Sequence, residues 1–175
     1  MGLIKVQTFD RDVASNGNVT LATLGLDDVS STSSAFVRNT NPRGHSGGQV
    51  GNTATSGPDD MSGYVRLNST TELEFGRELG TVKMVGELWE YTGAASGPDE
   101  FIVRDRLAIT LTNAGPSTGN VVSGVVDRNK CICFITGKAC TQTSQNNSAE
   151  IGANAYLDSN GDLTVERGSG ISTLV

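Results

Sequence analysis

The pentapeptide GHSGG at residues 44–48 is the stretch whose residue types come closest to an enzyme motif. It fits the pattern G-x-S-x-G, in which a strained turn between a strand and a helix exposes a serine nucleophile. The general base of such a serine comes from another part of the chain, yet the only histidine, His45, directly precedes Ser46. The flanking residues predict neither the strand nor the helix that the turn requires. A serine hydrolase acting through Ser46 is therefore a remote alternative.

The same stretch fits a long surface loop better. Residues 41–60 are rich in Gly, Ser, Thr, Asn and Pro, which favour turns and irregular backbone over strands. Loops of this length in compact domains commonly carry binding contacts. We expect the loop at 41–60 to point outward and to offer Arg43, His45 and Gln49 as contacts for a partner.

Trp89 and Tyr91 stand at the end of residues 81–91, a segment that alternates like a strand. Side chains alternate between the two faces of a strand, so Glu87, Trp89 and Tyr91 share one face. Aromatic side chains on a surface stack on sugar rings or anchor a protein partner, and they also suit the seam between two modules. Trp89 and Tyr91 are therefore candidate contact residues. The neighbouring carboxylates do not converge on one bond, so they predict no glycosidase.

Three cysteines lie close together, at Cys131, Cys133 and Cys140. Cys131 and Cys133 share one face of a strand and are poorly placed to bond each other. Cys133 and Cys140 could pair across a hairpin closed near residues 136–138, and an odd cysteine permits a bridge between subunits. With no histidine nearby, the spacing argues against zinc. We interpret the cysteines as small buried residues, with a Cys133–Cys140 disulfide as the alternative.

Acidic residues recur in three short segments, 26–28, 58–60 and 158–162. Calcium prefers such oxygen clusters, but the segment DSNGD at 158–162 does not have the spacing of an EF-hand loop. A hairpin turn accounts for it, because Asn160-Gly161 suits a two-residue type I′ turn. We expect neither a metal ion nor another cofactor.

The composition is polar but weakly charged. Charged residues make up 18% of the 175 residues, against about 25% in average soluble proteins, and aromatics only 5%. The net charge of −6 argues against nucleic-acid binding, because no basic patch would neutralise phosphates. No segment has the ~18 apolar residues of a membrane-spanning helix. The N-terminal residues show no secretory signal, so we expect synthesis in a host cytoplasm without export.

Two stretches of the chain resemble each other without gaps. Residues 66–85 match residues 156–175 at an offset of 90, and Leu67 and Leu73 meet Leu157 and Leu163. Upstream, with small gaps, 35–40 matches 133–138 and 18–28 matches 120–128. Such internal similarity indicates a repeated structural unit.

Both copies have the pattern of strands. The windows 19–24, 35–39, 63–67, 72–77 and 81–91 alternate or run apolar over short spans, and turn residues separate them. No window has the apolar stripe of a helix. The predicted fold is therefore all-β, with two tandem, internally repeated, small antiparallel β-sandwich or open-barrel modules. Module 1 covers 1–93, the joint 94–98 and module 2 99–175. Module 2 lacks the extension GELWEY of module 1, so its edge is either reduced or completed by another subunit.

The polar strands, the long loop at 41–60 and the joint segment GELWEYTGAASGPDEF resemble the virion-surface β modules of tailed bacteriophages, namely capsid decoration (cement) and fibre proteins. The resemblance implies a non-enzymatic structural protein of the virion, without catalytic residues. Its implied partners are other copies of the chain, a trimer among the options, and the major capsid or tail protein of the particle. The alternative is a receptor- or carbohydrate-binding adhesin that contacts a host surface glycan.

Overall fold

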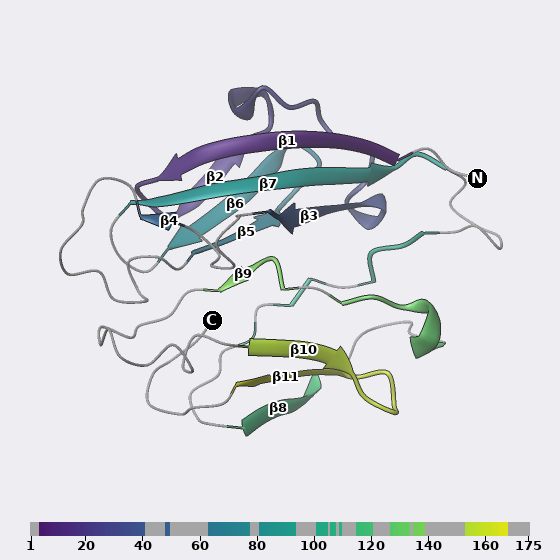
Figure 1. The fold of residues 1–175 in the computed structure, drawn as a ribbon. Helices are drawn as coiled ribbons and strands as arrows, with labels where there is room; N and C mark the ends of the chain where they lie inside the picture. Colours follow the sequence, from purple (N-terminus) through teal and green to yellow (C-terminus); the bar gives the residue numbers. More distant parts are fainter. Residues whose placement is uncertain are drawn as a thin grey trace.

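The computed structural model is all-β, as predicted. Its regular elements are strands and 3-10 helices of three residues, arranged as three small antiparallel sheets (Figure 1). The described residues, to which every structural statement below refers, are 4–40, 48–49, 63–77, 81–93, 101–104, 106–107, 109, 115–120, 127–133, 135–138 and 153–167.

Sheet 1 has the strand order β1-β7-β3, with the short strand β4 also paired to β7. The long strands β1 (Ile4–Val13) and β7 (Val82–Tyr91) pair along their whole length, from Ile4 opposite Tyr91 to Val13 opposite Val82. On the other side of β7 lie β3 (Ala35–Asn39) and β4 (Gly48–Gln49). Consequently β1 forms one border of this sheet.

Sheet 2 has the strand order β2-β6-β5-β9, formed by β2 (Gly17–Thr20), β6 (Glu72–Arg77), β5 (Gly63–Leu67) and β9 (Gly137–Lys138). The predicted strand at 19–24 was wrong in its second half. The chain leaves the sheet at Leu21, a fully buried residue, and forms the 3-10 helix Ala22–Leu24, which ends at Gly25 with a φ of 70°. The turn buries Leu21. A strand that continued to residue 24 would not have led us to predict this burial.

Sheets 1 and 2 pack face to face around one apolar core. The ring of Phe9 on β1 meets the ring of Phe75 on β6 edge to face, with 5.8 Å between centroids. Each fully buried aliphatic or aromatic side chain contributes about 1.5–3 kcal/mol. The core is formed by Phe9, Val13, Leu21, Leu26, Val29, Ala35, Val37, Val65, Leu67, Leu73, Phe75, Val82, Met84 and Leu88.

Gly86 explains why the apolar alternation of β7 is interrupted. It lies opposite Phe9 in the pairing of β1 with β7. A Cβ atom at this position would lie 2.5 Å from the Phe9 ring and 2.9 Å from the backbone oxygen of Arg38. The absence of a side chain at Gly86 therefore allows Phe9 to lie flat against β7.

Glu90 is a buried carboxylate on the inner face of β7, only 5% exposed. One of its oxygens, Oε1, accepts hydrogen bonds of 2.6 Å from both the backbone N–H and the hydroxyl of Ser30. These bonds satisfy a charge that would otherwise be costly to bury. They attach the connection between β2 and β3 to the central strand of sheet 1.

Sheet 3 consists of β10 (Ala153–Leu157), β11 (Leu163–Arg167) and β8 (Gly115–Asn120), in the order β10-β11-β8. The order matches β5-β6-β2 of sheet 2. The pair Leu157–Leu163 is equivalent, at the predicted offset of 90, to the pair Leu67–Leu73. This correspondence covers one hairpin, and the repeat of the modules stays a prediction.

The connection between β10 and β11 differs from the predicted two-residue type I′ turn. It spans residues 158–162, and Gly161 alone has a positive φ, of 82°, while Asn160 does not. The Asp158 carboxylate accepts hydrogen bonds from the backbone N–H groups of Asn160 and Asp162, at 2.8 and 3.1 Å. The aspartate therefore organises the turn, and a left-handed conformation is needed only at the glycine.

Residues beyond the predicted joint pack on the sheets of module 1. The backbone N–H of Val103 donates to the carbonyl of Ser33 at 2.7 Å, and the Arg106 guanidinium donates to the carbonyls of Thr32 and Ala35. Strand β9 extends sheet 2 by pairing with β5. The predicted joint at 94–98 lies outside the described residues, but the sandwich of sheets 1 and 2 draws on chain from both sides of it.

Candidate functional site

The outer face of sheet 1 carries the two aromatic residues that the sequence singled out. Along β7, Val82, Met84, Gly86, Leu88 and Glu90 are buried, whereas the residues that alternate with them are exposed or half-buried. Trp89, Tyr91 and Glu87 therefore share the outward face, as predicted from the strand alternation. This face is the candidate site because it combines aromatic, apolar and charged groups.

Trp89 and Tyr91 belong to a cluster of four aromatic rings. The Trp89 ring stacks on Phe36 of β3, with 5.9 Å between centroids and 18° between planes. Phe101 contacts both Phe36 and Tyr91, at 5.6 and 6.0 Å between centroids. Because Phe101 comes from beyond the predicted joint, the cluster connects residues on both sides of that joint. The same rings also form part of the surface.

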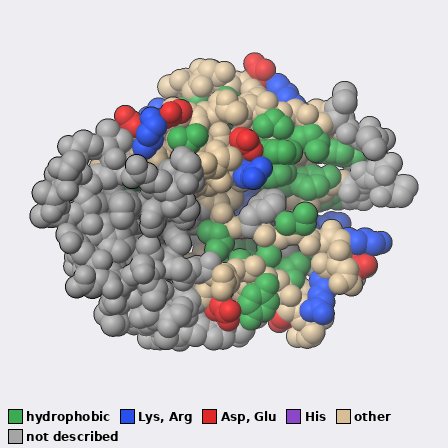
Figure 2. Space-filling view, in the orientation of Figure 1, with side chains coloured by type: hydrophobic (Ala, Val, Ile, Leu, Met, Phe, Trp, Pro, Cys, Tyr) green, Lys and Arg blue, Asp and Glu red, His purple; other side chains and the backbone are tan. Residues whose placement is uncertain are grey.

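Strand β1 extends this cluster with two exposed aliphatic residues. Val6 lies opposite Trp89 and Ile4 opposite Tyr91, and their exposed fractions are 44% and 58%. Phe101 is 38% exposed. Figure 2 shows hydrophobic side chains gathered over this part of sheet 1, at the upper right of the view. We call this surface the aromatic patch, and it consists of Ile4, Val6, Phe36, Trp89, Tyr91 and Phe101.

A hydrogen-bonded polar group borders the aromatic patch. The Glu87 carboxylate accepts a hydrogen bond of 2.8 Å from the indole N–H of Trp89, and the Arg38 guanidinium lies 3.6 Å from the same oxygen. Trp89 is thereby held in one orientation, which lowers the entropy that it would lose on binding a partner.

The far end of the same face is charged. The Lys83 ammonium lies 2.6 Å from the Asp10 carboxylate and 3.9 Å from that of Asp12. The hydrogen bond to Asp10 raises the pKa of Lys83 above its usual value. Val85 lies opposite Asp10, between the charged end and the patch. The outer face of sheet 1 is thus divided into an apolar half and a charged half.

A groove of about 360 Å³ borders the aromatic patch. Its aromatic rings, together with the guanidinium of Arg38 and the amide of Asn39, could receive a ligand with an apolar face and hydroxyl or carboxylate groups. Its lining residues are Phe36, Val37, Arg38, Asn39, Trp89 and Ile135.

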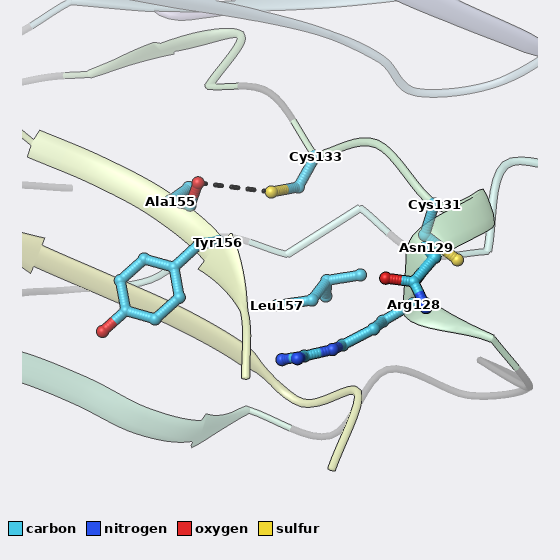
Figure 3. Close-up of a pocket in the computed structure, with 7 residues that line it drawn as sticks. All are labelled: Arg128, Asn129, Cys131, Cys133, Ala155, Tyr156 and Leu157. Carbon is cyan, nitrogen blue, oxygen red and sulfur yellow. Dashed lines mark hydrogen bonds between the residues drawn. The ribbon is translucent and has the colours of Figure 1, made fainter. Parts of the chain in front are cut away.

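A second depression, of about 280 Å³, lies next to β10. Figure 3 shows the sulfur atoms of Cys131 and Cys133 directed away from each other. The Cys133 thiol donates to the carbonyl of Ala155 and the Cys131 thiol to that of Asp127, both at 3.3 Å. Burial raises the pKa of Cys133, so its sulfur is a weaker nucleophile near neutral pH than an ordinary thiol.

The cysteine predictions have a mixed outcome. Cys131 and Cys133 are free and half-buried rather than fully buried, and the alternative of a Cys133–Cys140 disulfide stays a prediction. Of the hairpin predicted near residues 136–138, Gly137–Lys138 forms β9 and pairs with β5. Cys140 lies outside the described residues.

The loop residues are mostly not described. Gln49 lies in β4, where it pairs with Val82, while Arg43, His45 and Ser46 fall outside the described residues. The hydrolase alternative therefore receives no structural account.

The described residues hold neither a cluster of metal ligands nor a membrane-spanning helix. They contain no group of three or more His, Cys, Asp or Glu side chains placed to hold a metal ion. None of the helices in the described segments is long and apolar enough to cross a membrane.

The sequence interpretation missed four of the six residues of the aromatic patch. Ile4 and Val6 alternate with polar residues in IKVQTF, and this alternation was a usable signal for one exposed apolar face. Phe36 sits in a correctly predicted strand, but its contact with Trp89 depends on strand order. Phe101 carried no local signal, because its contacts with Phe36 and Tyr91 join segments far apart in the chain.

Comparison with known proteins returned no family model, no curated protein and no solved structure that matches the chain.

Proposed function

We propose that this chain is a non-enzymatic structural protein of the surface of a tailed-phage particle, a head decoration or fibre component, and that contacts between subunits hold it in place. The observation that carries the proposal is the exposed aromatic patch on sheet 1. The assignment to a phage particle rests on the resemblance drawn from the sequence. The expected partners are other copies of the chain and the major capsid or tail protein.

The patch has the character of a protein contact surface. Contiguous exposed apolar patches mark interaction sites more often than isolated apolar residues do, and aromatic residues are enriched at interface centres. The Glu87 side chain fixes Trp89, and a preorganised aromatic anchor suits a stable contact. Truncation of such an anchor typically costs about 2 kcal/mol or more of binding free energy.

The association state of the purified protein tests the subunit-contact part of this proposal. We expect a defined oligomer in light scattering after size exclusion. Trp89→Ala should weaken it by at least about thirtyfold, the equivalent of ~2 kcal/mol. Val85→Ala removes an apolar side chain from the same face outside the patch and serves as the matched control. A wild-type protein that stays monomeric would remove the support for subunit contacts.

The assignment to a virion has its own test. Mass spectrometry of purified particles should detect the chain as a structural component, and its gene should lie among capsid and tail genes. Its consistent absence from such particles would refute the assignment, whatever the oligomeric state.

A second candidate function is binding of a host surface glycan, and the groove next to Trp89 favours it. Aromatic rings beside Arg38 and Asn39 offer a stacking surface together with hydrogen-bond donors. Glycan-array binding that is lost in both Trp89→Ala and Arg38→Ala, with oligomerisation intact in Arg38→Ala, would identify an adhesin. Binding unaffected by these substitutions would exclude the groove as the glycan site.

A further inference from the structure

Strand β1 has a free edge in the described structure. This strand ends the order of sheet 1 and is ten residues long. In the described segments its backbone hydrogen bonds all run to β7, and none joins its other edge. Figure 1 shows β1 along the border of the sheet, on the side away from β3. Such an edge is a template for a strand from another chain.

We propose that β1 pairs antiparallel with β1 of a second copy about a two-fold axis, with Val6 opposite the partner's Val6. The inference rests on the proposed function, since it names the partner and the register of the subunit contact. In this arrangement the two copies of sheet 1 become one continuous sheet, and residues 4–8 of each copy form the pairing.

The fold limits which registers are acceptable. Directly opposite residues of an antiparallel pair point to the same side. Phe9 and Val13 face the core, and Ile4, Val6 and Thr8 face outward. Both sandwiches lie on the same side of the joined sheet only when inward residues meet inward residues. The two-fold axis must then pass midway between the two copies of one residue of β1, the residue at which the axis is said to lie.

Side-chain matching selects among the remaining registers. An axis at Lys5 places that lysine against its own copy, and an axis at Gln7 places Ile4 against the partner's Asp10. An axis at Thr8 sets Lys5 against the partner's Arg11 and Val6 against the partner's Asp10. Such like-charge or apolar-against-charged pairs are unfavourable.

The axis at Val6 avoids all of these pairings. Ile4 then faces the partner's Thr8, and Lys5 faces the partner's Gln7. Gln7 is held by two hydrogen bonds to the Asp27 backbone, at 2.7 and 3.1 Å. The partner's Lys5 consequently arrives beside the exposed Asp27 carboxylate, which already accepts a bond of 2.9 Å from Lys5 of its own chain.

The same register joins the two aromatic patches. Phe36, Trp89 and Val6 lie in one cross-strand row, because Phe36 faces Trp89 and Trp89 faces Val6. With Val6 opposite its own copy, this row runs on without interruption into the second subunit. The two exposed patches thereby become one apolar surface centred on the axis, where the core of a subunit interface is expected.

Cysteine cross-linking in the full chain tests the register. The background has Cys131→Ser, Cys133→Ser and Cys140→Ser, and its fold is checked by circular dichroism. Val6→Cys places two thiols opposite each other, with Cβ atoms about 4.5–5.5 Å apart. Oxidation, or a short bismaleimide, should then give a covalent dimer at least about tenfold faster than in Thr8→Cys. The Thr8 copies lie four residues apart along the joined strands, about 13 Å.

A second variant separates pairing from non-specific contact. Ile4→Cys combined with Thr8→Cys should cross-link as fast as Val6→Cys, because Ile4 faces the partner's Thr8. In the native background, Val6→Lys places like charges on the axis and should raise the dissociation constant about tenfold or more. Val85→Lys on the same face, away from the edge, should leave that constant unchanged.

The outcomes distinguish this inference from the proposed function. Equal cross-linking rates in Val6→Cys and Thr8→Cys, or a wild-type trimer, would overturn the two-fold pairing. If Trp89→Ala still dissociated the assembly, the proposed contact between subunits would stand without the two-fold pairing. A monomeric wild type without cross-linking at Val6→Cys would overturn both the pairing and the homo-oligomer.

Discussion

The buried carboxylate of Glu90 provides a direct test of what holds the sandwich together. The side chain is 5% exposed and accepts two hydrogen bonds of 2.6 Å from Ser30. Substituting Glu90→Ala leaves the Ser30 N–H and hydroxyl without their acceptor, in a part-buried position. Hydrogen bonds to a charged group contribute about 1.5–3 kcal/mol each. We therefore expect a loss of about 3–5 kcal/mol.

That loss is a large fraction of the stability of a domain, which is typically about 5–15 kcal/mol. For a chain of this size, 1 kcal/mol corresponds to a shift of about 2–4 °C in the midpoint of thermal unfolding. Glu90→Ala should therefore lower the midpoint by about 6–20 °C. Urea titration followed by fluorescence of Trp89, the only tryptophan in the chain, gives the free energy of unfolding independently.

Two further variants assign the effect to the hydrogen bonds. Ser30→Ala removes the hydroxyl but keeps the backbone N–H, so it should destabilise less than Glu90→Ala. The double variant should be less destabilised than the sum of the single losses, because both substitutions break one shared bond. A loss below about 1 kcal/mol in Glu90→Ala, the size of a surface effect, would refute the role assigned to this carboxylate.

Three other predictions follow from local geometry. Gly86→Ala should destabilise the fold by about 1–3 kcal/mol through its clash with Phe9 and the Arg38 backbone; urea titration with an unchanged midpoint would contradict it. Burial and the hydrogen bond to Glu74 raise the pKa of Tyr64 above its usual 10.0. The stabilisation from protonated Tyr64 should thus be full below pH 10 and lost as the pH rises through the pKa of Tyr64 in the folded protein. In Tyr64→Phe, the free energy of unfolding should fall less steeply over the same pH range. In a Cys140→Ser background, Cys133 should react with iodoacetamide more slowly than Cys131 at pH 8, because burial raises its pKa; equal rates, measured by peptide mass spectrometry, would count against this.

Local pattern predicted the elements that pair with their sequence neighbours. Residues 63–67 and 72–77 alternate clearly and are joined by a short turn, so the hairpin of β5 and β6 was readable from the chain alone. The strand at 81–91 was also found, with its faces assigned correctly. The end of β2 was not predicted correctly. The burial of Leu21 and the hydrogen bond from its backbone N–H to the carbonyl of Thr71 depend on packing beyond the strand.

Contacts between distant segments were beyond a reading of the sequence. The burial of Glu90 depends on Ser30, sixty positions away, which supplies its two hydrogen-bond donors. Trp89 and Tyr91 were identified by residue type, whereas Phe101 joined them only through tertiary packing. Sequence alternation fixes which face a side chain takes, but which strands become neighbours is decided by the whole core.

The measurement that bears most directly on the central claim is sedimentation equilibrium of the full chain over a wide concentration range. The claim is that subunits associate through the aromatic patch of sheet 1. We predict an oligomeric mass for the wild type and for Val85→Ala, and a shift towards the monomer for Trp89→Ala. A monomeric wild type, or an oligomer equally stable in Trp89→Ala, would contradict it.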